Sequence, residues 1–195
     1  RVMSSIFSAR SLTIINAGGD PDNLIRKGHE RVLQARLEDA VFFWDSDRQR
    51  ELQERVETLA TLTFQQNLGS YLEKAQRLQE ICSRLSPDND TLRKAALLCK
   101  TDLTTETVFE ISELQGVMGG LYAREEGYPE EIWKAIYEHY QPVSVEDHSP
   151  TTENGALLSI ADRLDTISSC FSIGIRPRGS SDPFGLRRQA QGLIK

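Results

Sequence analysis

The chain has 195 residues, of which 38% are hydrophobic and 27% charged, and its formal net charge is −6. This composition is typical of a globular chain that can bury a core, and no apolar run reaches the roughly 18 residues of a membrane-spanning helix. The acidic balance disfavours free-standing nucleic-acid binding, which depends on neutralising phosphates with Lys and Arg. Any such role has to be local or shared with other domains.

The N-terminal segment, RVMSSIFSARSLTIINAGGD, has no initiator Met and no continuous apolar core of a signal peptide, so we expect an internal piece of a longer protein. Residues 1–20 are predicted to be the tail of a preceding domain or a linker, which ends at a Gly-Gly-Asp-Pro cluster. An edge strand within SIFSARSLTII is the alternative. Three cysteines without CxxC spacing indicate neither a disulfide framework nor a zinc ribbon, and favour a reducing, cytoplasmic compartment.

From residue 21 onward, hydrophobic residues recur mostly three, four or seven apart, which predicts an all-α domain over residues 21–175 without a convincing strand. Asp20 and Pro21 are a cap and first-turn pair for one long amphipathic helix in DPDNLIRKGHERVLQARLEDAVFFW. The helical pattern continues through residues 48–66, with Leu52, Val56, Leu59 and Leu62 on one face, and is predicted to break at 67–69. A second apolar stripe then runs from Leu72 to Leu85.

The turn sequence SPDND precedes a predicted helix through TLRKAALLCKTDLTTETVFE, with Asn89 or Asp90 as its cap. YPEEIWKAIYEHY predicts a further helix, because proline and two glutamates suit a first turn. ENGALLSIADRLDTISSCF predicts a helix with a buried face.

Residues 176–195 predict a loop and the start of a helix that leads into a next domain, with Asp182 and Pro183 at its N-terminus. We expect too little following chain to bury its apolar residues, Leu186, Leu193 and Ile194.

Catalytic signatures are weak. The histidines have no HxH or HExxH spacing, and we expect His29 and His148 on the surface. No G-x-S-x-G elbow, P-loop or GxGxxG is present. Cys99 ends an apolar stripe, where a small buried hydrophobe is favoured over a reactive thiol.

The blocks KAALLCKTD, AIYEHY and SIADRLD stand in an order that resembles the all-helical HD-domain phosphohydrolases. In that superfamily a His-Asp doublet and a later Asp bind metal. Here the doublet falls on Cys99 and Lys100, and the later position is Asp162. A thiol and an ammonium replace two ligands, so we expect an HD-like fold with a metal-free site in which Lys100 pairs with Asp162. An active metal-dependent phosphohydrolase that uses Asp102, His139 and Asp162 is the alternative.

Five blocks resemble, in order, the bacterial glycyl-tRNA synthetase beta subunit: GHERVLQARLEDAVFFWDSDRQ, TFQQNLGSYLEKAQRLQEI, ELQGVMGGLYAREEG, IYEHYQP and LLSIADRLDTISSCFSIGIRPRGSSDPFGLRRQAQGLI. The resemblance covers about residues 20–195. The chain departs from the family pattern at His29, where Asn is common, and at Gly185, where Ala is usual. We expect Gly185 to weaken the last helix by up to about 1 kcal/mol relative to Ala.

The resemblance implies part of an alpha2beta2 glycine–tRNA ligase that attaches glycine to tRNA(Gly) with ATP and Mg2+, whose adenylate-forming site lies on the alpha subunit. The beta subunit is implied to supply tRNA recognition and assembly. For this segment the resemblance implies no catalytic residue and no bound cofactor. Its implied partners are the alpha subunit, tRNA(Gly) and other domains of the beta subunit, and no membrane.

RNA duplexes are recognised mainly through phosphates and 2′-hydroxyls, so exposed basic residues are the candidate contacts. Local charge selects Arg176, Arg178, Arg187 and Arg188. Packing of Arg187 and Arg188 against a following domain is the alternative. Three further candidates also have neighbouring acids that they could simply balance, namely Arg31, Arg36 and Lys100.

Overall fold

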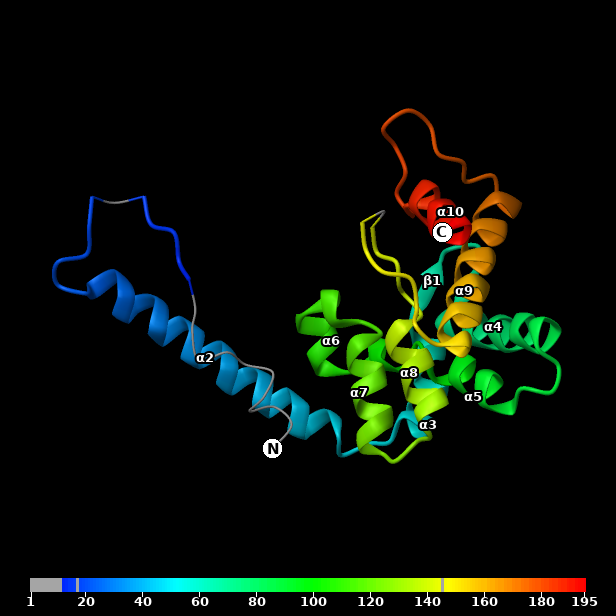
Figure 1. The fold of residues 1–195 in the computed structure, drawn as a ribbon, viewed down its shortest axis with the longest axis horizontal. Helices are drawn as coiled ribbons and strands as arrows, with labels where there is room; N and C mark the ends of the chain where they lie inside the picture. Colours follow the sequence, from blue (N-terminus) through cyan, green and yellow to red (C-terminus); the bar gives the residue numbers. More distant parts are fainter. Residues whose placement is uncertain (1–11, 17, 145) are drawn as a thin grey trace. The chain divides into compact units, whose positions relative to one another are not determined.

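The computed structural model describes residues 12–16, 18–144 and 146–195. Its helices are α2 (Leu24–Asp47), α3 (Leu52–Arg55), α4 (Tyr71–Leu85), α5 (Asp90–Leu98), α6 (Glu106–Glu110), α7 (Val117–Glu125), α8 (Glu130–Glu138), α9 (Glu153–Ser172) and α10 (Leu186–Ile194) (Figure 1). Short 3-10 helices, η1 (Glu57–Thr61), η2 (Thr101–Thr104) and η3 (Ser112–Leu114), lie between them, and β1 (Thr63–Gln65) and β2 (Gly69–Ser70) form a small antiparallel pair. The all-α prediction is confirmed.

The chain divides into two compact units, and the boundary falls between Phe43 and Trp44, inside α2. The boundaries predicted from sequence, at residues 20 and 175, stay predictions. The predicted edge strand lies mostly outside the described residues, and residues 12–16 form no strand.

In the first unit, α2 begins where the backbone N–H groups of Ile25 and Arg26 donate to the Asp20 carboxylate, at 3.1 and 2.8 Å. Asp20 therefore caps the helix as predicted, but Pro21 lies ahead of the first helical residue and not within the first turn. The apolar residues of α2 in this unit are largely exposed, with Phe42 at 66% and Leu24 at 69%.

In the second unit, the last residues of α2 are tied to α6 and α7. The Trp44 ring stacks on Tyr122 with centroids 5.1 Å apart. The Asp47 carboxylate accepts from the N–H groups of Glu106 and Thr107, at 2.8 and 3.0 Å, and from the Tyr122 hydroxyl at 2.9 Å. Asp47 is thus a cap for α6, supplied from 59 residues away in sequence.

The prediction of continuous helix through residues 48–66 was wrong. Leu52, Val56 and Leu59 are buried, so the apolar spacing was correctly read as a buried face. That face is nevertheless carried by two short helices, α3 and η1, and β1 follows them. The break predicted at 67–69 falls on the turn between the strands and on Gly69, the first residue of β2, which has φ of 79°. Ser70 and Glu73 then form a capping box that starts α4.

The predicted helix through residues 91–110 is also interrupted. Asn89 caps α5 by accepting from the Leu92 N–H at 2.9 Å, as predicted, but α5 ends at Leu98. The Thr101 hydroxyl donates to the Leu98 carbonyl at 2.7 Å, and the Thr105 side chain caps α6. These threonines bond to nearby backbone groups and so compete with the continuous helical ladder.

The core of the second unit lies between α4, α5, α8 and α9, where Leu78, Leu92, Ile136 and Leu158 are fully buried. Helix α7 packs closely on α8 because Gly120 faces it without a side chain. A Cβ on Gly120 would lie 2.8 Å from Tyr137 Cα. The chain needs glycine here for the two backbones to approach.

Helix α10 packs against α9. The N–H groups of Leu186 and Arg187 donate to the Asp182 carboxylate at 2.7 and 3.0 Å, so Asp182 caps α10 as predicted. Gly185 precedes the helix in a left-handed conformation, with φ of 59°, so the predicted weakening of the helix interior does not arise. Leu186 is buried, contrary to prediction, whereas Ile194 is 87% exposed.

Candidate functional site: a buried ion-pair network beside a polar cavity

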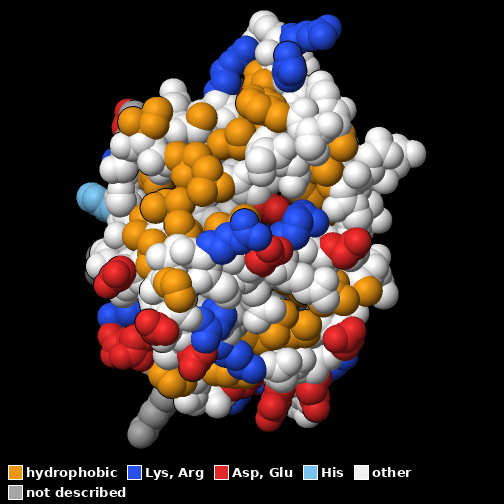
Figure 2. All heavy atoms as spheres, turned by 90° about the vertical axis from the view of Figure 1, so that its right-hand side faces the viewer, with side chains coloured by type: hydrophobic (Ala, Val, Ile, Leu, Met, Phe, Trp, Pro, Cys, Tyr) orange, Lys and Arg blue, Asp and Glu red, His pale blue; other side chains and the backbone are white. Residues whose placement is uncertain are grey.

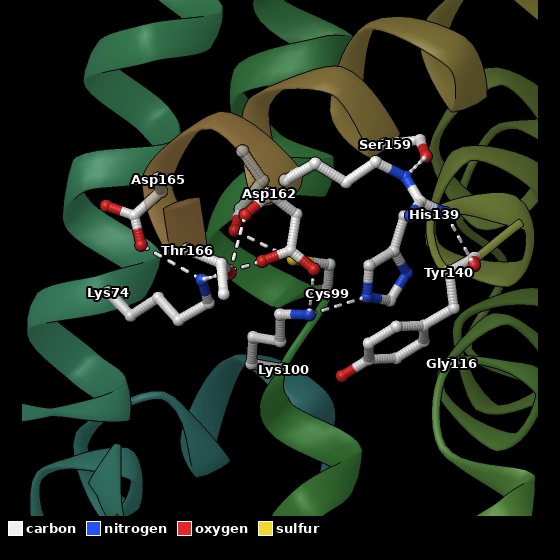
Figure 3. A network of polar contacts seen from close by, with 12 residues as sticks. Lys74, Cys99, Lys100, Gly116, His139, Tyr140, Ser159, Asp162, Asp165 and Thr166 are labelled. Atoms are coloured by element: carbon white, nitrogen blue, oxygen red, sulfur yellow. Dashed lines mark hydrogen bonds and ion pairs between the residues drawn. The ribbon is translucent and has the colours of Figure 1, made fainter. Parts of the chain in front are cut away.

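Lys100 follows the end of α5 and is buried, with 1% of its surface exposed. Its ammonium donates to Asp162 Oδ2 at 2.6 Å and lies 3.0 Å from His139 Nε2 (Figure 3). The same nitrogen lies 3.9 Å from the centroid of the Tyr140 ring, where a cation–π contact adds to its stabilisation. The pair of Lys100 and Asp162 expected from the sequence is therefore present.

A second lysine approaches Asp162 from α4. Lys74 Nζ lies 2.8 Å from Asp162 Oδ1, as an ion pair not aligned as a hydrogen bond. It also donates to Asp165 Oδ2 and Thr166 Oγ1, both at 2.9 Å. Arg77 Nε donates to Asp165 Oδ1 at 2.6 Å. Charges from α4, α9 and the end of α5 thus compensate one another in the core.

The protonation states follow from this geometry. Burial disfavours the charge on Asp162, but Lys100 and Lys74 outweigh it and hold the pKa of this carboxyl well below its usual range. Burial likewise disfavours the charge on Lys100, but the attraction of Asp162 outweighs burial and raises the pKa of Lys100. Burial and then Lys100 lower the pKa of His139 to about 3, so this ring is neutral at pH 7. The Nδ1 atom lies 2.6 Å from the Ile136 carbonyl, to which it donates, so Nε2 accepts from Lys100.

The residues present do not fit a metal ion. The Lys100 ammonium stands between the Asp162 carboxylate and the His139 ring, and it uses the lone pairs that a metal would need. Asp102 points elsewhere, because its Oδ2 accepts from the N–H groups of Gly116 and Gly119 at 2.5 and 3.1 Å, at the start of α7. Within residues 12–16, 18–144 and 146–195 no three His, Cys, Asp or Glu side chains converge as a metal site. The phosphohydrolase alternative is not supported.

A cavity of about 510 Å³ adjoins this network. His139, Tyr140 and Asp162 line it from the network side, and Arg163, Arg188 and Gln189 line it from α9 and α10. The Arg163 guanidinium is buried and connects several elements. It donates to the Ser159 hydroxyl at 3.2 Å, to the carbonyls of Tyr140 and Pro142 at 3.1 and 2.9 Å, and to Gln189 Oε1 at 3.2 Å.

The four arginines selected by local charge all lie on the segment that follows α9, and all are exposed: Arg176, Arg178, Arg187 and Arg188. Arg187 Nη1 donates to the Gly179 carbonyl at 2.7 Å, which fixes the loop against α10. Figure 2 shows Lys and Arg side chains gathered at the end of the molecule where Figure 1 places the loop between α9 and α10. All four therefore lie on one exposed segment, residues 176–188.

The other candidates separate. Arg31 and Arg36 are exposed on α2 in the first unit. Lys100 has to be withdrawn as an RNA contact, because its buried ammonium is already bound to Asp162 and His139. His29 and His148 are exposed, as predicted. Cys99 is buried, also as predicted, and burial raises the pKa of its thiol to about 12, so it is not a nucleophile at neutral pH.

Comparison with known sequences gives the family. The sequence profile of the glycyl-tRNA synthetase beta subunit matches residues 6–195. The chain belongs to this family. The glycine–tRNA ligase beta subunit of Chromohalobacter salexigens is 47% identical over 179 residues, which are 90% of this chain and 26% of that protein. The Aquifex aeolicus beta subunit is 44% identical over 90% of this chain and 27% of its own length. The Acidithiobacillus ferrooxidans protein is 49% identical over 86% and 25%.

The resemblance seen in the sequence blocks is confirmed, and the chain spans about a quarter of the length of these family members. The prediction that the helices are arranged as in HD domains stays a prediction. None of the described helices is both long enough and apolar enough to span a bilayer.

Sequence reasoning did not single out Lys74 or Arg163. Lys74 lies four residues before the buried Leu78, so its position on the buried face of α4 was readable from helical spacing. Arg163 lies between Asp162 and Leu164 in a strongly charged stretch, and no sequence signal distinguishes it from a surface arginine. Its burial depends on α10, which folds back on α9 from beyond a loop.

Proposed function

We propose that this chain is a tRNA-binding part of the beta subunit of glycine–tRNA ligase, without hydrolase chemistry of its own. It contributes to a reaction in which the whole enzyme attaches glycine to tRNA(Gly) with ATP and Mg2+, and the alpha subunit holds the adenylate-forming site. Family membership supports the setting, since the chain is about a quarter of such a subunit. The observation that carries the RNA role is the group of exposed arginines between α9 and the end of α10.

The charge of this segment is opposite to that of the rest of the chain. Residues 176–195 contain five Lys and Arg and one Asp, whereas the other 175 residues contain 18 Lys and Arg and 28 Asp and Glu. Phosphate recognition needs a local excess of positive charge and is compatible with an acidic remainder. An acidic chain can therefore contact RNA here.

The placement of Arg187 and Arg188 in the first turn of α10 supports an anionic partner. Cations at a helix N-terminus oppose the macrodipole, so these two charges do not stabilise the helix by that route. The Leu186 and Arg187 N–H groups of this turn already donate to Asp182, so the favourable interaction with an RNA phosphate at the same place would come from the two guanidinium groups.

The test is aminoacylation by the full-length protein with its partner subunit. Two double variants change the basic segment, Arg187→Ala/Arg188→Ala and Arg176→Ala/Arg178→Ala. Arg84→Ala is the matched control, because Arg84 is exposed on α4 and pairs with Glu80 on the same helix. We expect each double variant to raise the KM for tRNA roughly tenfold, and to leave kcat and the KM values for glycine and ATP unchanged.

An unchanged KM for tRNA in both double variants would remove the RNA role. A lower kcat together with loss of subunit association, measured by light scattering, would show that the segment acts in assembly instead.

A further inference from the structure

The buried charged groups around the cavity beside the network have an excess of positive charge. Asp162 is the acid that lines it from the core, and this carboxylate already faces two lysines, Lys100 at 2.6 Å and Lys74 at 2.8 Å. Lys74 is shared with Asp165, which also binds Arg77. The carboxylates of the network are therefore fully matched by these cations.

Arg163 is an additional buried cation in the same place, with 5% of its surface exposed. All four acceptors that it reaches are neutral oxygens, from a hydroxyl, an amide and two backbone carbonyls. A guanidinium has five N–H donors, so after these four bonds one N–H on Nη1 has no acceptor among the residues that the structure describes. Burial lowers the pKa of Arg163, and the attraction of Asp162 offsets this only in part, so the buried charge favours an anion in the adjoining space.

Arg188 adds a second positive charge to this cavity from α10, and its side chain is exposed. Glu113, from η3, is the opposing charge, but it is exposed as well and so is strongly screened by water. Tyr140, Gln115 and Gln189 offer neutral hydrogen-bonding groups around the same space. The His139 ring also lines the cavity and is neutral, because burial and, to a smaller extent, the charge of Lys100 lower its pKa. This neutral state agrees with a positive potential on that side of the cavity.

We propose that this cavity is a binding site for a phosphate group, held by the buried Arg163 and the exposed Arg188. Arginine suits this role because its planar donors match phosphate oxygens in pairs. The volume of about 510 Å³ admits a phosphate together with the sugar or base attached to it. The group comes from an RNA backbone or from a free phosphate compound, and binding does not depend on the proposed tRNA contacts of Arg176 and Arg178.

The test titrates the full-length protein with inorganic phosphate by calorimetry, in chloride buffers of matched ionic strength. Arg188→Gln is expected to weaken phosphate binding about tenfold, the loss of one charge-assisted contact. Glu113→Gln is expected to strengthen binding about twofold, because it removes a repelling charge at the surface. Arg84→Gln, outside the cavity, is expected to have no effect. Arg163→Lys keeps the charge but loses the paired donors, and its thermal unfolding is measured alongside because Arg163 also holds α10.

Opposite responses of Arg188→Gln and Glu113→Gln support the site. Absence of saturable binding up to about 10 mM phosphate, or equal binding by Arg188→Gln and Arg84→Gln, overturns it. Adding tRNA then identifies the source: release of bound phosphate by tRNA assigns the site to an RNA phosphate, and retention assigns it to a free compound. The KM of Arg176→Ala/Arg178→Ala for tRNA is measured separately, so failure of this site and failure of the proposed RNA role are distinguishable.

Discussion

Replacing Lys100 by methionine tests the buried network, since methionine has similar length without charge. The closest charged atoms of Lys100 and Asp162 are 2.6 Å apart. With about 3.5 Å between charge centres and an effective dielectric constant of about 20, their attraction is about 5 kcal/mol. Loss of the lysine also removes its own desolvation cost, and Lys74 stays beside Asp162. We therefore expect Lys100→Met to lower the free energy of unfolding by about 3 kcal/mol at pH 7.

Urea unfolding followed by tryptophan fluorescence measures this loss, because Trp44 and Trp133 both lie in the second unit. A double-mutant cycle with Asp162→Asn isolates the pair, and we expect a coupling energy of about 2 to 3 kcal/mol. Coupling below about 0.5 kcal/mol would refute the reasoning, since the ion pair would then add nothing.

The same variant has a defined pH dependence. The folded-state pKa of Asp162 lies well below its usual range, so the stability that this carboxylate contributes is present above its unfolded pKa of about 4. That stability is lost as the pH falls through the lower folded-state value. The difference in unfolding free energy between wild type and Lys100→Met is therefore expected to shrink below about pH 4. A difference that stays constant down to pH 2 would contradict the assignment.

Four further substitutions test the fold and its electrostatics. Gly120→Ala places a Cβ against the Tyr137 backbone and is expected to lower the free energy of unfolding, measured in urea, by about 1 to 3 kcal/mol. Gly28 on α2 has open space around it, so Gly28→Ala is expected to increase the helicity measured by circular dichroism. Asn89→Ala removes the cap of α5 and is expected to lower the unfolding free energy by about 1 kcal/mol; no change would show that the cap is dispensable. Burial raises the pKa of Asp102 to about 6, so its contribution to stability is present below about pH 4 and falls by about 3 kcal/mol as pH rises through 6. Asp102→Asn should remove this decline from the unfolding free energy measured between pH 4 and 7, and a persisting decline would assign it to another group.

Local sequence signals predicted the elements that depend on neighbouring residues. Pro129 and its two following glutamates marked the start of α8, and Asp182 marked that of α10. These predictions succeeded because caps and first turns are set within a few residues. The apolar spacing of residues 52–59 also identified a buried face correctly.

The same spacing did not reveal that this face belongs to short helices followed by a strand. A helix of one turn and a 3-10 helix present apolar residues at similar intervals to a continuous helix, so periodicity alone cannot separate them. Asp47, the last residue of α2, accepts from N–H groups of α6, and no local pattern reports such a contact.

The site was predicted in part. The pairing of Lys100 with Asp162 followed from charge compensation, because two departures from the metal-binding pattern left one ammonium near one carboxylate. Lys100 was also kept among the RNA contacts because of its positive charge, and its burial and its bonds to Asp162 and His139 remove it. Arg163 was not predicted, because its environment is made by α10 and by the chain after α8.

The most direct test of the RNA role is a titration of the full-length protein with tRNA(Gly) over a series of salt concentrations, followed by fluorescence anisotropy. Each phosphate contact contributes roughly one unit to the slope of log affinity against log salt. We expect Arg187→Ala/Arg188→Ala to weaken binding and to reduce this slope by up to about two, relative to Arg84→Ala. Unchanged affinity and an unchanged slope would contradict the proposal that this segment contacts RNA.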